Sequence, residues 1–202
     1  MNGEALGVIA LSYLIGSVPT GLVLVRVLKG EDIRNYGSGN IGTVNVFRVA
    51  GTPIAIAVLA VDVLKGLVPV LLAVRFGTGP WTAIACGLAA IVGHNWSVFL
   101  GFRGGKGIAT SFGVLVGLSP VAALAAAAVW IVVVAITRYS SLGSLLGALS
   151  VPFVLWRLRG PEAYIAFGVI AAAFAIYRHR SNIQRLVAGT ELRISDRGTP
   201  KS

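Results

Sequence analysis

The sequence predicts an all-α integral membrane protein with seven transmembrane segments, the fourth of them a short half-helix. Of its 202 residues, 56% are hydrophobic and 12% are charged, whereas a soluble globular domain carries about 25% charged residues. Four long stretches contain no Asp, Glu, Lys or Arg: 5–25, 76–102, 107–137 and 139–156. A bilayer-spanning helix needs about 20 mostly apolar residues. We therefore expect one membrane-embedded domain over residues 1–202, with about residues 192–202 forming a flexible polar tail.

Apolar runs bounded by charges or turn residues define the expected segments. They lie at about 4–25, 53–74, 81–100, 108–118, 121–137, 140–156 and 161–177. Thr52 is expected to cap the second segment, with Pro53 at its first helical position. Ser119-Pro120 separates the fourth segment from the fifth, because proline cannot continue a helix interior. The fourth segment is too short to span alone and is expected to lie inside the bundle.

The distribution of basic residues predicts the orientation. With the N-terminus outside and seven alternating segments, thirteen of the 17 Lys and Arg residues fall on the inner face, three fall on the outer face and Lys65 lies within a helix. Basic loops stay on the cytoplasmic side of a membrane, so the N-terminus is expected outside and the C-terminus in the cytoplasm. A single helix over 108–137 would place the basic C-terminal tail outside, which favours the break. Topology thus accounts for the net charge of +10, and no nucleic-acid partner is expected.

The counts of cysteine and histidine exclude several kinds of chemistry. Cys86 is the one cysteine, so no intrachain disulfide or Cys-x-x-Cys site is possible. Two histidines and one thiol are too few for an ordinary His/Cys zinc site. The acidic start at residues 1–4 does not resemble the basic start of a cleaved signal peptide.

The first of three glycine-rich segments on the predicted inner face covers residues 37–48. Its three glycines permit backbone conformations that are closed to other residues. The segment also concentrates a hydroxyl, two amides and a guanidinium, from Ser38, Asn40, Asn45 and Arg48. An interhelical turn would also be rich in Gly, Ser and Asn, but twelve residues is long for a turn in so compact a chain. We therefore expect a functional loop.

The second segment, residues 93–110, places Arg103 and Lys106 among glycines immediately before a helix start. Such a loop can direct backbone N–H groups at an anion, and the helix dipole adds about half a positive charge. It is not a P-loop, because Leu100 stands where the first glycine should be and Gly107 replaces the Ser or Thr after the lysine. The alternatives are a phosphate cradle and an ordinary basic turn, and the position before a half-helix favours the cradle.

The third segment covers residues 177–191. If it is helical, His179 and Asn182 share a face, and the flanking arginines would keep His179 neutral and able to accept a proton. The alternative is a basic tail that touches anionic lipid headgroups.

Two charged residues fall within the second predicted span. Asp62 and Lys65 lie three residues apart and can pair on one face of a helix. Because a charge at the bilayer centre costs about 2.5–3.5 kcal/mol, both are expected to face the protein interior. A structural ion pair is the favoured interpretation and a substrate contact is the alternative. His94 fits a helix-end histidine and a site residue equally well.

Taken together, the three segments resemble one family, the bacterial membrane glycerol-3-phosphate acyltransferases that use acyl phosphate as the donor (the PlsY family). The matching residues are Gly37-Ser38-Gly39-Asn40-Ile41-Gly42, Asn45 and Arg48; Gly93-His94 and Gly104-Gly105-Lys106-Gly107-Ile108-Ala109-Thr110; Asp62-Val63-Leu64-Lys65-Gly66; and Arg178-His179-Arg180, Asn182-Ile183, Arg185-Leu186, Gly189 and Glu191. The resemblance runs from about residue 5 to 191. The family usually reads Gly-Ala-Thr-Asn where this chain has Gly42-Thr43-Val44-Asn45, so a hydroxyl role there is displaced or lost.

The resemblance implies transfer of a fatty acyl group from acyl phosphate to the 1-hydroxyl of glycerol 3-phosphate. The products would be lysophosphatidic acid and phosphate, in the first step of phospholipid synthesis. It also implies no metal or other cofactor, a multi-pass location in the bacterial plasma (inner) membrane, an active site facing the cytoplasm, and a functional link to the acyltransferase that forms acyl phosphate. The His-x4-Asp motif of other glycerol-phosphate acyltransferases is absent, because Phe99 and Gln184 stand five residues after the two histidines.

The resemblance also implies a set of site residues. The expected catalytic residues are Ser38, Arg48, His179 and Asn182, and the expected substrate-binding residues are Asn40, Asn45, His94, Gly104, Gly105, Lys106, Gly107, Thr110 and Arg185. Lys106 and the glycine backbone around it would bind the phosphate of glycerol 3-phosphate, while Arg48 and Ser38 would contact the head of the acyl phosphate. His179 with Asn182 would orient the attacking hydroxyl or accept its proton, and a substrate phosphate is the alternative proton acceptor. The acyl chain would lie between helices.

Three other classes of protein are alternatives to this family. A carrier or channel for an anionic metabolite also suits half-helices and cations, but the polar clusters lie at one face and no inverted repeat is visible. A non-catalytic scaffold does not require three glycine-rich loops with cations. A CDP-alcohol phosphatidyltransferase would need clustered metal-binding aspartates, which the sequence lacks.

Overall fold

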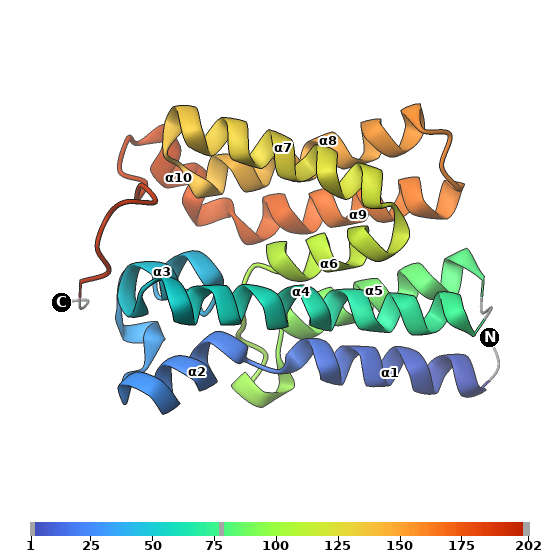
Figure 1. Cartoon of the computed structure of the whole chain (residues 1–202), viewed down its shortest axis with the longest axis horizontal. Coiled ribbons are helices and arrows are strands. Elements are labelled where there is room, and N and C mark those ends of the chain that lie inside the picture. Colours follow the sequence, from blue (N-terminus) through green and yellow to red (C-terminus); the bar gives the residue numbers. More distant parts are fainter. Residues whose placement is uncertain (1–2, 77–78, 200–202) are drawn as a thin grey trace.

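The computed structural model describes residues 3–76 and 79–199, and within these ranges every regular element is a helix (Figure 1). The α-helices are α1 (Gly3–Ser17), α2 (Thr20–Lys29), α3 (Thr43–Ala50), α4 (Thr52–Arg75), α5 (Pro80–Asn95), α6 (Ile108–Leu118), α7 (Pro120–Thr137), α8 (Ser140–Arg157), α9 (Glu162–Arg178) and α10 (Arg180–Val187). Two short 3-10 helices, η1 (Ile33–Asn35) and η2 (Val98–Leu100), lie in the connections. The all-α prediction is confirmed.

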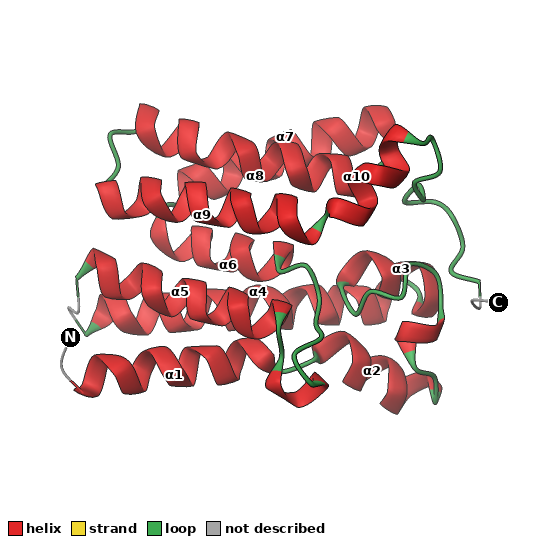
Figure 2. Cartoon of the chain, turned by 180° about the vertical axis from the view of Figure 1, so that it is seen from behind, coloured by secondary structure: helices red, strands yellow, loops and turns green. Residues whose placement is uncertain are grey.

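The long helices form two groups that run along the long axis of the molecule, with α6 between them (Figures 1 and 2). Helices α1, α4 and α5 make one group and α7, α8 and α9 make the other, and α6 packs mainly on α4. Successive long helices reverse direction, so α2, α3, α10 and the C-terminal segment gather at the end opposite the N-terminus. Helix α6 begins near the middle of the long axis, which brings the loop before it between the two groups.

Glycines set how closely α6 approaches α4. A Cβ at Gly66 would overlap the carbonyl oxygen of Thr110, and a Cβ at Gly113 would overlap that of Val63. The two helices therefore touch through their backbones, the close contact that small residues allow between membrane helices. This contact fixes the start of α6 and the end of the glycine loop that leads into it.

The predicted break between the fourth and fifth segments is confirmed. The Ser119 side chain accepts a hydrogen bond from the Ala122 N–H at 3.4 Å, and Pro120 is the first residue of α7. Helices α4, α6, α7, α8 and α9 begin and end within one residue of the predicted bounds.

Three local predictions are wrong. The third segment was expected over 81–100, but α5 ends at Asn95 and only the short 3-10 helix η2 follows within that range. The first segment was expected to be one continuous helix over 4–25, but it breaks between α1 and α2, because Pro19 lacks an N–H and disfavours helical geometry at Val18. Thr52 was expected to cap the second segment, but Gly51 occupies that position and Thr52 is the first helical residue. Helix α3 forms within a stretch that the sequence marks only as a polar segment, and α10 forms within the third polar segment, where a helix was one possibility.

Four helical stretches in the described residues are long and apolar enough to cross a membrane: Gly3–Lys29, Thr52–Arg75, Pro80–Leu100 and Pro120–Thr137. Ile108–Leu118 is a shorter apolar helix, in keeping with a half-helix. Large apolar side chains such as Leu124 and Ile136 are 70% and 77% exposed, which suits a surface that faces lipid tails. The number of spans and the orientation remain predictions.

Candidate active site

Two cavities meet at the end of the molecule where the polar segments gather. The larger has a volume of about 460 Å³ and lies between α4, α6, α7, α8 and α9. Its inner part is lined by apolar side chains, including Leu115, Phe112, Trp130, Val151 and Phe167. The smaller has a volume of about 270 Å³ and is lined by Ser38, Gly39, Asn40, Gly104, Lys106, Arg178, Arg180, Ser181 and Arg185. Ser38, Asn40, Lys106 and Arg185 line both.

Asn45 organises the loop over residues 33–45. Its side-chain amide donates to the carbonyl oxygens of Ile33 (3.3 Å), Tyr36 (3.1 Å) and Asn40 (2.9 Å). Its side-chain oxygen accepts the N–H of Ser38 at 2.9 Å. Every polar atom of the Asn45 amide thus bonds to the loop itself, which presents Ser38 and Asn40 to both cavities.

The glycine loop over residues 104–107 is held by Arg178 from the end of α9. The guanidinium donates to the carbonyl oxygens of Gly104 (2.9 Å) and Gly105 (2.6 Å) and lies 5.3 Å from the ring centroid of Trp96. Two bonds from α1 fix the start of the same connection: the Tyr13 hydroxyl donates to the Trp96 carbonyl at 2.9 Å, and the Ser97 hydroxyl donates to the Ser17 carbonyl at 2.5 Å. The loop is therefore fixed at both ends.

Lys106 projects from this loop into a network on α10. Its ammonium donates to Asn182 Oδ1 at 2.5 Å, and the Asn182 amide donates to Glu191 Oε1 at 2.5 Å. Arg185 donates to Glu191 Oε2 at 2.8 Å. Burial and the nearby cations Arg185 and Arg48 outweigh the attraction of Glu191 and lower the pKa of Lys106 to about 8. The ammonium is therefore charged at neutral pH and desolvated, which strengthens its attraction for an anion.

Glu191 is the acceptor on which this network converges. Burial alone would raise its pKa, but the hydrogen bonds from Asn182 and Arg185 and the charge of Arg185 outweigh burial and hold the pKa below its ordinary value. The carboxylate is therefore ionised at neutral pH and fixes the amide orientation of Asn182, because an ionised carboxylate can only accept hydrogen bonds.

His179 is the junction between α9 and α10 and is 3% exposed. Its Nδ1 lies 2.8 Å from the Ala175 carbonyl oxygen, so Nδ1 carries the proton and donates, which leaves Nε2 as an acceptor. Burial, followed by the charge of Lys106, lowers the pKa of His179 to about 4. The imidazole is therefore neutral at physiological pH, and the main cause is burial rather than the flanking arginines on which the prediction rested.

The C-terminal segment covers Arg48. The guanidinium of Arg48 donates to the carbonyl oxygens of Leu192 (3.1 Å) and Arg193 (2.7 Å). The backbone adds bonds from the Gly198 N–H to the Arg48 carbonyl and from the Gly37 N–H to the Thr199 carbonyl. The described part of the expected polar tail, residues 192–199, therefore lies against the first polar segment. Residues 200–202 lie outside the described residues.

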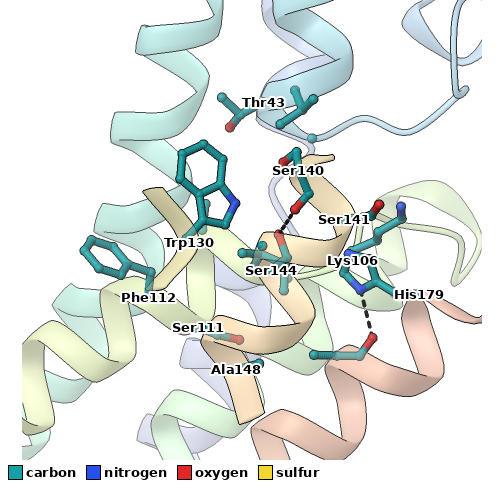
Figure 3. A pocket seen from close by; sticks show the side chains of 18 of the residues that line it. Thr43, Lys106, Ser111, Phe112, Trp130, Ser140, Ser141, Ser144, Ala148 and His179 are labelled. Carbon is teal, nitrogen blue, oxygen red and sulfur yellow. Dashed lines mark hydrogen bonds between the residues drawn. The ribbon is translucent and has the colours of Figure 1, made fainter. Parts of the chain in front are cut away.

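Hydroxyl groups line the wall where the polar and apolar parts meet. Figure 3 shows Thr43 and Ser140, Ser141 and Ser144 of α8 around the cavity, with Trp130 on one side and Lys106 and His179 on the other. Ser144 donates to the Ser140 carbonyl at 2.8 Å. The hydroxyl of Thr43 is buried and has no hydrogen-bond partner among the described residues.

Most of the predicted site residues come together here. Ten of the thirteen line the larger cavity: Ser38, Asn40, Asn45, Arg48, His94, Lys106, Gly107, His179, Asn182 and Arg185. Gly104 lines the smaller one. Gly105 and Thr110 line neither: Gly105 packs on the His94 ring, and Thr110 is fully buried against α4.

Sequence reasoning missed several contributors. Arg178 and Glu191 lie in the third polar segment, where Glu191 is the one acidic residue and could have been found as the partner of a nearby cation, whereas nothing in the sequence distinguishes Arg178 from the other arginines there. Trp130 and the serines of α8 lie in apolar spans, where three hydroxyls at positions 140, 141 and 144 were the one signal of a polar wall. Among the described residues, no group of three His, Cys, Asp or Glu side chains could hold a metal ion.

This arrangement can bind an elongated amphiphile. Lys106 and three arginines surround the smaller cavity and can neutralise phosphate, since guanidinium and ammonium groups form strong charge-assisted hydrogen bonds with it. The apolar part of the larger cavity begins within the same group of residues and can hold a hydrocarbon chain. The site is thus shaped for a phosphate next to a lipid tail.

Comparisons with known proteins agree with this reading. The family model described as glycerol-3-phosphate acyltransferase matches residues 6–189. A glycerol-3-phosphate acyltransferase of Desulforudis audaxviator is 51% identical over 196 residues, which cover 94% of this chain and 96% of that protein. One from Geobacter sulfurreducens is 49% identical over 185 residues, which cover 91% and 94%.

Solved structures show the same fold. The glycerol 3-phosphate form of PlsY (YgiH), an integral membrane glycerol 3-phosphate acyltransferase, superposes with a TM-score of 0.90 at 42% identity, covering 95% of this chain and 96% of that one. The lysophosphatidic acid form of PlsY gives a TM-score of 0.87 at 38% identity, covering 95% of each chain. The family match, the full-length relatives and the shared fold together show that this chain belongs to the glycerol-3-phosphate acyltransferase family, as an integral membrane enzyme of the PlsY type.

Proposed function

We propose that this glycerol-3-phosphate acyltransferase takes its acyl group from acyl phosphate. It would transfer that group to the 1-hydroxyl of glycerol 3-phosphate and release lysophosphatidic acid and inorganic phosphate. The observation that carries the proposal is the junction of a cation-rich cavity with an apolar one through four shared residues. Two phosphate-bearing substrates need several cations at one place. The site does not require a donor that carries a bulky nucleotide or a carrier protein.

The two substrates divide the site between them. Glycerol 3-phosphate places its phosphate in the smaller cavity, against Lys106, Arg180 and Arg185, which leaves its 1-hydroxyl pointing toward the larger one. The acyl chain lies in the apolar part of the larger cavity, and its phosphate lies between Ser38 and Arg48. The carbonyl carbon then sits beside His179, within reach of the hydroxyl. Holding both substrates in this way converts a bimolecular reaction into one within a single complex.

The reaction is attack of an alcohol on a mixed anhydride. The hydroxyl oxygen forms a bond to the carbonyl carbon, and the bond from that carbon to the phosphate oxygen breaks. Cations next to the reacting carbonyl stabilise the charge that develops. His179 Nε2 accepts a hydrogen bond from the hydroxyl and orients it, but a base with a pKa of about 4 holds a proton poorly at neutral pH. A phosphate oxygen, whose second pKa is about 6, is the better final acceptor for the hydroxyl proton.

The proposal includes a location and a partner. The basic segments gather at one end of the molecule, and basic segments face the cytoplasm. We therefore place the protein in the bacterial plasma membrane as a multi-pass protein with its site open to the cytoplasm. There it would receive acyl phosphate from the acyltransferase that forms it.

The test uses purified protein in lipid mesophase or detergent with EDTA present. Palmitoyl phosphate and glycerol 3-phosphate should yield phosphate and lysophosphatidic acid in equal amounts, followed by phosphate release and by mass. The same protein with palmitoyl-CoA in place of palmitoyl phosphate should yield no product. Product from palmitoyl-CoA alone would contradict the donor assignment and leave the acceptor intact.

A further inference from the structure

Three ionisable side chains lie buried beneath the glycine loop without a part in the chemistry proposed above. Asp62 and Lys65 of α4 are 2% and 5% exposed, and His94 near the end of α5 is 5% exposed. Replacing a buried ion pair by apolar residues of similar volume is often neutral or stabilising. Stability alone therefore does not explain why a membrane helix carries this pair.

Lys65 joins the break in the first segment to α4. Its ammonium lies 2.7 Å from Asp62 Oδ1 and donates to the Val18 carbonyl oxygen at 3.0 Å. Val18 precedes Pro19, where α1 ends and α2 has not yet begun. The Val18 carbonyl accepts the Thr20 N–H at 3.0 Å. Because proline interrupts the helical hydrogen bonds, this oxygen can also accept a second donor from a neighbouring helix. Lys65 supplies that donor.

Asp62 faces His94 on the side toward the loop, at a distance beyond a direct hydrogen bond. His94 Nδ1 lies 4.0 Å from Asp62 Oδ1, and both residues line the larger cavity. The His94 carbonyl oxygen accepts the Gly105 N–H at 3.0 Å. The His94 ring fills the space next to Gly105, since a Cβ at Gly105 would overlap ring atom Nε2. His94 thus supports the residue directly before Lys106 through both its ring and its backbone.

We propose that Asp62, Lys65 and His94 form a buried positioning unit that sets the place of the glycine loop, and with it the Lys106 ammonium at the phosphate site. The unit runs from the α1–α2 break through α4 to the end of α5 and ends under Gly105. These three are positioning residues, because they act on substrate through the loop. The inference rests on the proposed function only in taking Lys106 as the ligand of the glycerol 3-phosphate phosphate.

The test asks whether Asp62 and Lys65 position the glycine loop or only neutralise each other's buried charge. Asp62→Asn or Lys65→Met alone leaves one buried charge uncompensated and should lower Tm. The double variant Asp62→Asn/Lys65→Met removes both charges and should recover most of that loss. Its Kd for glycerol 3-phosphate, measured by calorimetry without a donor, should nevertheless be weaker than wild type by about tenfold, because the loop is displaced. The KM for acyl phosphate should stay within about twofold of wild type.

Two further variants serve as a control for general destabilisation and as a second test of the same prediction. Val58→Ala in α4 removes packing from a fully buried position and should lower Tm without changing the Kd for glycerol 3-phosphate. His94→Ala removes the ring under Gly105 and should weaken the same Kd even if the double variant does not fold. A wild-type Kd in both His94→Ala and the double variant, or an equal loss in Val58→Ala, overturns the positioning unit.

Failure of the inference and failure of the proposed function can be told apart. If wild-type protein binds glycerol 3-phosphate but does not use acyl phosphate, the proposed donor is wrong and the binding comparison stays valid. If wild-type protein does not bind glycerol 3-phosphate at all, both the phosphate site and the positioning unit are wrong.

Discussion

At the scale of single residues, Lys106 lies at the junction of the site, because its ammonium borders both cavities and is held by the Asn182 side chain. A hydrogen bond to a charged group contributes about 1.5–3 kcal/mol. Lys106→Ala should therefore raise the KM for glycerol 3-phosphate about tenfold or more, with a smaller loss in kcat. Steady-state kinetics with each substrate varied in turn measures both values. A loss confined to kcat would show that the glycine loop does not bind this phosphate.

The charge of the same residue predicts a pH dependence. Its lowered pKa of about 8 means that the free enzyme loses the ammonium charge as the pH rises through 8, whereas an ordinary lysine keeps its charge to above 10. The kcat/KM for glycerol 3-phosphate should therefore fall above about pH 8, since this ratio reports ionisations of the free enzyme. In Lys106→Arg this alkaline fall should disappear, because a guanidinium stays protonated. The same alkaline fall in the arginine variant would contradict the assignment.

At the scale of elements, α8 forms the wall of the cavity that holds the acyl chain. Ala148 lines this cavity two turns beyond Ser140 (Figure 3), so it lies about 12 Å deeper along the helix. Ala148→Leu should raise the KM for palmitoyl phosphate and leave that for octanoyl phosphate near the wild-type value. The matched control is Leu149→Phe, which adds bulk to an exposed face of the same turn. An equal effect on both donors would place the chain elsewhere.

The sequence allows the elements to be predicted better than their contacts. The bounds of α6 could be predicted because charges or proline bracket it, and Ser119-Pro120 fixed the boundary with α7. The break at Pro19 could not be predicted, because a proline within a long apolar run does not show whether the helix bends or ends. The roles of Arg178 and Asn45 could not be predicted, because their partners are backbone carbonyls whose direction depends on the folded loop. The tail on Arg48 joins residues about 145 positions apart, a distance over which local pattern carries no information.

At the scale of the whole molecule, the basic segments lie at one end, and the positive-inside rule predicts that this end faces the cytoplasm. Ser195 is an exposed residue of the C-terminal segment, which lies at the basic end, and Glu162 is the exposed first residue of α9, which begins at the opposite end (Figure 1). In intact cells, a membrane-impermeant thiol reagent should label Glu162→Cys and should label Ser195→Cys only after permeabilisation. Wild-type protein, whose Cys86 is buried, should stay unlabelled and serves as the control. The reverse pattern would invert the orientation.

The central claim is that the two cavities hold both substrates at once, so that the acyl group passes directly from donor to acceptor. The most direct test is the initial rate measured over a grid of palmitoyl phosphate and glycerol 3-phosphate concentrations. Direct transfer within a ternary complex predicts double-reciprocal lines that intersect. Parallel lines, the pattern of a ping-pong reaction through an acyl-enzyme, would contradict the claim.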